Sequence, residues 1–162
     1  MASTIGSYSL IFGLCSSFLI IFLSIINFNN TNKLDDKILS FTFLQFLFVV
    51  ISFAGLILSF VNSDFSNETV FNHSHTTKPL FYKISGTWGN HEGSLLLWLL
   101  VLTFFIYLFL LKSQNQPKQY RILTILFQQI IIIGFFIFSI KTSNPFNYLY
   151  PIPEEGLGLN PI

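Results

Sequence analysis

The stretch ILSFTFLQFLFVVISFAGLILSFV occupies residues 38–61 and contains no charged side chain. Its apolar residues fall on nearly every side of a helix, whereas a helix at the surface of a soluble domain keeps one polar face. A helix of about 20 apolar residues spans the roughly 30 Å of hydrocarbon in a bilayer. This stretch is therefore predicted to be a transmembrane helix.

Three further runs share this composition, at residues 8–28, 94–111 and 122–140. All Lys, Arg, Asp and Glu side chains lie outside the four runs, and only 9% of the chain is charged, against about 25% in an average soluble domain. The runs also lack the alternation of apolar and polar residues found in membrane β-barrel strands. We therefore expect an all-α integral membrane protein with four transmembrane helices, at about 8–28, 38–61, 94–111 and 122–140.

The connecting segments suggest one membrane domain over residues 1–162 with two external parts. These parts are a long loop at 62–93 and a Pro-rich C-terminal tail at 141–162. Loops 29–37 and 112–121 hold more Lys and Arg than the other side, and the richer side faces the matrix or cytoplasm. The loop and the tail are thus expected to face the intermembrane or periplasmic space together. The basic residues counted are Lys33, Lys37, Lys112, Lys118 and Arg121 on one side and Lys78, Lys83 and Lys141 on the other.

The composition also indicates a compartment and excludes some partners. Phe occurs 21 times and Ala only at positions 2 and 54, a bias typical of an AT-rich, organellar gene. We expect the mitochondrial inner membrane, with the bacterial plasma membrane as the alternative. The net charge of +1 and the lack of a basic cluster argue against a nucleic-acid partner. Cys15 is the single cysteine, so no internal disulfide can form.

Few polar residues lie within the predicted spans. Gln45, Gln128 and Gln129 lie at membrane depth, where hydrogen bonds between helices are worth about 0.6 to 2 kcal/mol each. The alternative is that these glutamines line a functional path through the membrane. A small transporter is the weakest hypothesis, because no ionisable residue lies inside any predicted span.

The external loop holds all three histidines, His73, His75 and His91. In an extended strand, His73 and His75 would point to the same side and could begin a zinc or copper site. Such a site needs three or four ligands, however, and only Glu92 lies beside His91. A metal site formed by this chain alone is therefore not predicted.

One part of the loop and the start of the third span form a candidate site, which we call the tryptophan patch. Its glycines permit close backbone packing, and its aromatic rings could support a large planar ligand at the membrane surface. Alternatively, the rings form an ordinary aromatic belt that anchors the helix, and the helix dipole stabilises the carboxylate. The patch comprises Tyr82, Lys83, Trp88, Gly89, Asn90, His91, Glu92, Gly93 and Trp98, with His75 as a secondary member.

Several motifs in the loop and tail occur in a recognisable order. They are Ser63-Asp64-Phe65, Asn72-His73-Ser74-His75-Thr76, Tyr82-Lys83, Trp88-Gly89-Asn90-His91-Glu92-Gly93-Ser94-Leu95-Leu96-Leu97-Trp98, Thr142-Ser143-Asn144-Pro145-Phe146 and Pro153-Glu154-Glu155-Gly156-Leu157-Gly158-Leu159-Asn160-Pro161. Together they resemble the CcmF family, the heme lyase subunits of bacterial and mitochondrial cytochrome c maturation. The resemblance extends from about residue 64 to the C-terminus, and the first two spans fit by position and hydropathy only.

The resemblance implies heme in the assembled complex, with its ligands supplied by a companion chain. In the family, the Asn-Pro landmark is followed by a heme-ligating His-Pro-Pro segment, then by a Trp-rich external motif and by further transmembrane histidines. This sequence stops at Ile162, before the positions of all three features. His75 and His91 match motif positions that are not the family's axial ligands. No catalytic residue is therefore assigned to this chain. The implied partners are companion heme lyase fragments, other cytochrome c maturation membrane subunits, apocytochrome c and the lipid bilayer.

The chain is thus expected to be the N-terminal fragment of a split CcmF-type heme lyase. It would help to form the membrane platform where heme is joined to apocytochrome c cysteines, without being catalytic alone. The alternative is a structural membrane subunit of a larger respiratory assembly that has lost lyase activity. Loss of the family's heme ligands favours this alternative, whereas retention of residues 88–93 favours the lyase, because a structural brace needs no such loop.

Overall fold

The computed structural model describes residues 1–28 and 36–158. In chain order the elements are α1 (Ala2–Phe28), α2 (Asp36–Val61), α3 (Glu68–His73), α4 (Leu80–Gly86), α5 (His91–Lys112) and α6 (Lys118–Lys141). Helices α1, α2, α5 and α6 are long and apolar enough to cross a membrane, which confirms the prediction of an all-helical fold with four candidate spans. Within the described ranges there is no β-strand, only an isolated bridge between Asn67 and Tyr148.

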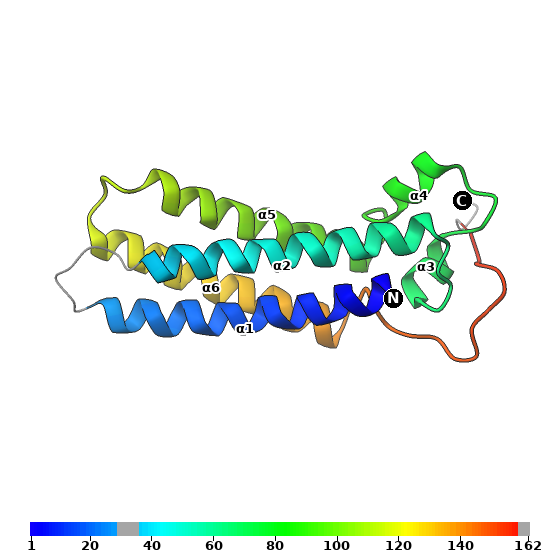
Figure 1. Ribbon diagram of the computed structural model, residues 1–162, viewed down its shortest axis with the longest axis horizontal. Coiled ribbons are helices and arrows are strands. Elements are labelled where there is room, and N and C mark those ends of the chain that lie inside the picture. The colour runs from blue at the N-terminus through cyan, green and yellow to red at the C-terminus, as the bar shows by residue number, and fades with distance from the viewer. Residues whose placement is uncertain (29–35, 159–162) are drawn as a thin grey trace.

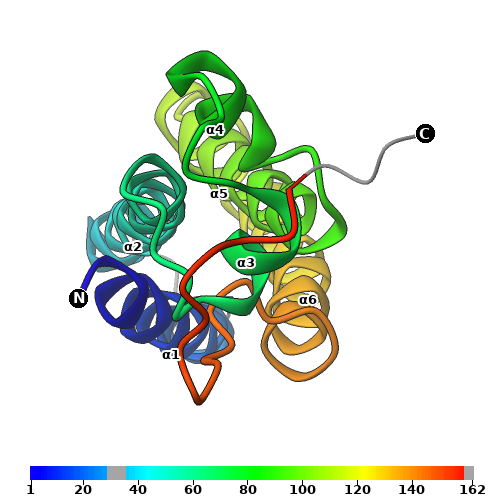
Figure 2. The ribbon, with the colours of Figure 1, turned by 90° about the vertical axis from the view of Figure 1, so that its right-hand side faces the viewer.

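The four long helices run side by side along the length of the molecule (Figure 1). Helix α1 packs mainly against α2 and α6, and α5 packs against the same two helices. The end-on view shows these long helices arranged around a common centre, with α3 and α4 at the near end (Figure 2). The bundle therefore brings α2 and α6 to opposite sides of a common centre.

The packing of this bundle is typical of a membrane protein. Large apolar side chains such as Phe22, Phe105 and Phe127 are exposed on its outside, whereas the buried positions of α1 are mostly glycine and serine. Lipid solvates apolar side chains as well as a protein core does, so membrane helices associate through small residues that let their backbones approach. At one close crossing, a Cβ added to Gly55 would lie 3.2 Å from the Cα of Gly6.

Polar side chains meet at the centre of the bundle. Gln45 of α2 and Gln129 of α6 exchange two amide hydrogen bonds, of 3.0 and 2.9 Å, and Gln45 also donates to the Ser17 hydroxyl of α1. Both glutamines are fully buried. Their predicted role as interhelical hydrogen-bonding groups is therefore confirmed. Gln128 is only half-buried and takes no part in this network.

Several helices extend beyond the predicted spans. Helix α1 begins at Ala2 rather than at residue 8, α5 at His91 rather than at 94, and α6 at Lys118 rather than at 122. Hydropathy marks the depth of the hydrocarbon, but a helix continues into the headgroup layer where caps and neighbours satisfy its polar groups. At the start of α1, the Ser3 and Ser59 hydroxyls are hydrogen-bonded at 2.8 Å.

Residues 62–93, predicted as one long loop, contain the two short helices α3 and α4. They lie at the same end of the bundle as the segment that follows α6 (Figure 1). Predictions that involve residues 29–35 and 159–162, including Lys33 in the count of basic residues, lie outside the described residues.

Candidate functional site

Asn67 joins the loop after α2 to the tail after α6. Its Oδ1 accepts hydrogen bonds from the backbone N–H groups of Thr69 and Val70, which caps the start of α3. Its Nδ2 donates to the Pro145 carbonyl in the tail at 2.9 Å and to the Ser3 hydroxyl of α1 at 3.1 Å. One buried side chain therefore connects the N-terminal helix, the loop and the tail.

Backbone hydrogen bonds extend this contact along the tail. The Leu149 N–H donates to the Ser66 carbonyl at 2.8 Å, and the Gly158 N–H donates to the Ser74 carbonyl at 3.0 Å. Gly156 lies so close to the loop that an added Cβ would be 2.1 Å from the Ser74 carbonyl oxygen. Figure 2 shows the tail passing across α3 at this end of the bundle. The tail is thus packed onto the loop at both ends of the segment 149–158.

Glu155 makes the most polar contact between tail and loop. Its carboxylate accepts from the Thr76 hydroxyl at 2.6 Å and from the Thr76 backbone N–H at 3.0 Å. These hydrogen bonds stabilise the charged carboxylate and hold the pKa of Glu155 below its usual range. His75 Nε2 lies 3.8 Å from the same carboxylate, and His75 Nδ1 lies 3.0 Å from the Thr77 hydroxyl. The structure therefore places His75 in the contact between loop and tail, apart from the start of α5.

Two lysines of the loop are held by neighbouring loop atoms. Lys83 Nζ donates to the Ser63 hydroxyl at 2.6 Å, and Lys83 is buried. It was predicted as a member of the tryptophan patch, but the structure directs its amine to the end of α2. Lys78 Nζ donates to the His73 carbonyl at 3.0 Å, and partial burial lowers the pKa of this amine.

Asn90 and Gly93 shape the start of α5. Asn90 Oδ1 accepts from the Gly93 N–H at 2.7 Å as a helix N-cap, and Asn90 Nδ2 donates to the Gly86 carbonyl at 2.8 Å. A Cβ added to Gly93 would lie 1.6 Å from the Thr87 carbonyl oxygen, so only glycine fits this backbone. An added Cβ at Gly89, in contrast, would make ordinary contacts. Asn90 and Gly93 therefore fix the backbone conformation at the start of α5, next to Trp88 and His91.

His91 follows this cap and links α5 to α6. Its Nδ1 lies 2.9 Å from the Ser143 hydroxyl, and the edge of its ring packs against Phe138 with centroids 6.1 Å apart. His91 is exposed, and within residues 1–28 and 36–158 its Nε2 makes no hydrogen bond. A ring held at one nitrogen can contact a ligand through the other. Glu92 is half-buried in the first turn of α5, where the helix dipole favours a carboxylate.

The aromatic members of the patch form an open surface. The Trp88 ring stacks on Phe53 of α2, with centroids 6.5 Å apart and planes at 24°, and remains 42% exposed. Tyr82 and Trp98 are 55% and 57% exposed. Trp98 lies two turns beyond His91, or roughly 10 Å along α5. The three exposed rings thus lie on α4, on the segment before α5 and on α5 itself.

The described residues fit a heme only in part. They offer exposed aromatic rings and one imidazole with an open nitrogen, but they contain no group of three or more His, Cys, Asp or Glu side chains that could hold a metal ion. His73 is the last residue of α3, so residues 73–75 do not form the extended strand in which His73 and His75 would point to the same side. A heme held at this surface by two axial ligands would need at least one of them from another polypeptide or segment.

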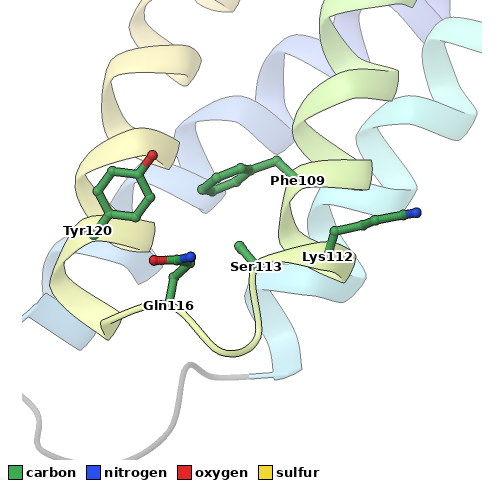
Figure 3. Close-up of a pocket in the computed structure, with 5 residues that line it drawn as sticks. All are labelled: Phe109, Lys112, Ser113, Gln116 and Tyr120. Carbon is green, nitrogen blue, oxygen red and sulfur yellow. The ribbon is translucent and has the colours of Figure 1, made fainter.

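A pocket of about 300 Å³ lies at the opposite end of the bundle, where α5 turns into α6 (Figure 3). In Figure 3, Phe109 and Tyr120 face one another across it, and the Lys112 amine points away from them. Its lining residues are Phe109, Lys112, Ser113, Gln116 and Tyr120. None of them belongs to the tryptophan patch, so this pocket is separate from the candidate site.

Some residues that build the site were not predicted from the sequence. Asn67 could have been recognised, because an Asn immediately before a Glu in a first helical turn is a typical N-cap. Ser143 and Phe53 carry no local signal, because their partners His91 and Trp88 are distant along the chain.

Comparisons with known proteins connect this arrangement to cytochrome c biogenesis. No protein-family model matches the chain. The cytochrome c-type biogenesis protein CycK of Rhizobium meliloti is 49% identical over 117 residues, which are 72% of this chain and 17% of that protein. CycK of Bradyrhizobium diazoefficiens is 39% identical over 166 aligned residues, which cover 100% of this chain and 25% of that protein. The solved structure of the cytochrome c heme lyase CcmF matches 93% of this chain and 26% of its own, with a TM-score of 0.77 and 25% identity.

The chain is a homologue of one part of CcmF. It spans about a quarter or less of the length of the curated relatives that it matches. The resemblance to CcmF predicted from the loop and tail motifs is confirmed. The Bradyrhizobium alignment also extends it, because it covers the first two spans, which fitted by position and hydropathy only.

Proposed function

We propose that the chain forms part of the membrane platform of a CcmF-type heme lyase, on which heme, as substrate, is joined to apocytochrome c. The observation that carries this proposal is the match of 93% of the chain to the CcmF heme lyase at a TM-score of 0.77. The chain covers 26% of that protein, and the proposal assigns the other parts of the lyase to one or more companion fragments.

The proposed reaction is the addition of an apocytochrome c cysteine thiol to a heme vinyl group. The S–H bond breaks, the sulfur bonds to one vinyl carbon, and the proton is transferred to the other, so that a thioether forms and nothing is released. The platform contributes orientation, because holding two reactants in a reactive geometry removes much of the entropic part of a barrier. No residue of this chain is assigned a proton transfer.

The tryptophan patch supports this role through its exposed rings and its rigid base. Trp88 is held from one side by Phe53 and remains partly open to a flat ligand on the outside. The open nitrogen of His91 lies at the start of α5, three residues after Trp88, and the Asn90–Gly93 cap fixes the backbone at this point. An aromatic belt that only anchors α5 is the competing interpretation.

We further propose that the patch faces the periplasm or intermembrane space. The opposite end of the bundle carries Lys112, Lys118 and Arg121, and the positive-inside rule assigns such an end to the cytoplasm or matrix. The low alanine content supports the mitochondrial inner membrane, whereas the bacterial relatives support a plasma membrane. Heme ligands from the companion, other cytochrome c maturation subunits and apocytochrome c complete the proposed assembly.

Substitutions in the patch test the platform. Trp88→Ala and His91→Ala are expected to lower covalently assembled cytochrome c by about tenfold or more, since misplaced reactants lose the advantage of orientation. Trp88→Phe keeps a ring on Phe53 and is expected to retain more activity. Phe105→Ala, which removes another exposed ring of α5, is the matched control. Normal cytochrome c levels in both patch variants would show that the patch only anchors the helix.

Purification from native membranes tests the alternative of a structural respiratory subunit. The lyase proposal expects the tagged chain to recover a CcmF-type companion that carries heme. Stoichiometric recovery with a respiratory complex alone, and no such companion, would replace the proposal with the structural role.

A further inference from the structure

The outward face of α6 is an apolar surface with a gap at its centre. Residues three and four positions apart share one side of a helix, which places Gly134 in the middle of this face. A Cβ added to Gly134 would have no atom within 4 Å. The side chains around the gap are 43–68% exposed. They are Phe127, Ile130, Ile131, Ile137 and Phe138.

The other glycines of the long helices serve close packing within the chain. A Cβ added to Gly6, Gly13, Gly55 or Gly93 would lie 3.0 Å or less from a neighbouring atom. Glycine inside a helix is less stable than alanine, so a membrane helix tolerates it best where another backbone or side chain must approach closely. Among the glycines of the four long helices in the described residues, Gly134 alone has no such neighbour.

The relatives of this chain are much longer than the chain itself, so their remaining residues can supply the helix that packs against Gly134. This chain covers 26% of the CcmF heme lyase and 25% of the Bradyrhizobium CycK protein, so most of such a protein must pack around the matched part. Helices pack by placing the side-chain ridges of one into the grooves of the other. A large apolar side chain of an incoming helix would fill the gap between the ridges on either side of Gly134.

This face also leads to the candidate site. Phe138 at its outer end packs against the His91 ring, and His91 bonds the Ser143 hydroxyl just beyond α6. A helix docked along the face would therefore end beside His91. We infer that the face of α6 around Gly134 is the docking surface for a transmembrane helix of the companion fragment. This inference rests on the proposed function, which supplies the companion.

A substitution that fills the gap tests the docking surface. Gly134→Leu blocks it, and Ala54→Leu adds a side chain of the same type to an exposed position of α2 as the matched control. Each tagged chain is purified from native membranes in mild detergent, and the CcmF-type companion is quantified per mole of tagged chain. Gly134→Leu is expected to reduce recovery by about tenfold or more, because a filled interface cannot close. Gly134→Ala is expected to lose less, and Ala54→Leu to retain the wild-type ratio.

The outcomes separate this inference from the proposed function. Gly134→Leu is expected to insert normally, because position 134 is exposed and an added Cβ there meets no atom within 4 Å outside the backbone of its own helix. Wild-type recovery of the companion by Gly134→Leu, or an equal loss with Ala54→Leu, would overturn the docking surface and leave the lyase proposal standing. Gly134-dependent recovery of a second copy of this chain instead of the companion would also overturn it. A wild-type chain that recovers no CcmF-type companion would overturn both.

Discussion

His91 and Ser143 are 52 positions apart in the chain, yet the imidazole Nδ1 and the hydroxyl oxygen lie 2.9 Å apart. This contact joins the start of α5 to the segment just after α6. Phe138 packs against the same ring, so two residues near the end of α6 hold the imidazole. The orientation of His91 in the tryptophan patch therefore depends on the position of the tail.

Removal of the Ser143 hydroxyl is expected to weaken the proposed platform without unfolding it. A hydrogen bond of this kind is worth about 0.5–1.5 kcal/mol, so Ser143→Ala is expected to lower cytochrome c assembly by roughly two- to tenfold. Ser143→Thr keeps the hydroxyl and is expected to restore most of the loss. The measurement is covalent heme in cytochrome c per inserted chain. Normal assembly in Ser143→Ala together with a large loss in His91→Ala would mean that the ring acts without this hydroxyl.

Gly93→Ala is expected to destabilise the start of α5. The added methyl would lie 1.6 Å from the Thr87 carbonyl oxygen, so the cap must shift, at a cost of about 1–3 kcal/mol or more. Gly89→Ala is the matched control, since its methyl would lie 3.5 Å from the nearest atom. Thermal unfolding in detergent, followed by circular dichroism, compares the two variants. Equal melting temperatures would contradict the close approach at Gly93.

The amide pair at the bundle centre is expected to show coupled effects. Gln45→Leu leaves the buried Gln129 amide without its partner, and Gln129→Leu does the converse. Each single variant is therefore expected to be less stable than the wild type, whereas the double variant recovers part of the loss. A double-mutant cycle in detergent measures the coupling, expected at about 0.6–1.7 kcal/mol. Strictly additive losses would show that the two amides do not interact.

The contact between Glu155 and the loop is expected to weaken in acid. The pKa of Glu155 is lower in the folded chain than its ordinary value of 4.5, so the contact is fully stabilised above that value. This stabilisation is lost as the pH falls through the lowered pKa, because the protonated group is a weaker acceptor. A spin label on Ile152→Cys in a Cys15→Ser background is expected to become more mobile below pH 4.5.

Two further variants control this pH experiment. Glu155→Gln is expected to give a mobile label already at neutral pH, with little further change in acid. Glu154→Gln alters an exposed neighbour and is expected to behave as the wild type. Identical label mobility in Glu155→Gln and the wild type at neutral pH would show that the carboxylate does not hold the tail.

The four spans could be predicted because hydrocarbon imposes a minimum apolar length and excludes charge, and both are properties of the sequence alone. The role of Gln45 and Gln129 followed from the same reasoning, since an amide at membrane depth needs a hydrogen-bond partner. The starts of α1, α5 and α6 were predicted too late. Helices continue past the hydrocarbon where local caps such as Asn90 satisfy their backbone, and hydropathy does not report caps.

The sequence motif identified the members of the candidate site as a group. It did not identify which neighbour each side chain contacts. Trp88 and His91 are close in the chain, but the Trp88 ring packs on Phe53 of α2 and the His91 ring packs on Phe138 of α6. Lys83 instead donates a hydrogen bond to Ser63, and His75 lies beside Glu155 of the tail. A linear motif shows which residues are close in the chain, but it does not show in which direction each side chain points.

The sequence by itself determined that this chain has four stretches long and apolar enough to cross a membrane and, through the motif at residues 88–98, that it resembles CcmF. Both are local properties, set by the chemistry of consecutive residues. Only the tertiary structure decided that Asn67 holds the tail, that Ser143 holds His91, and that Gly134 is left open on the outside. These relationships depend on the order in which the helices pack around the bundle, and that order follows from the fit of whole helix surfaces.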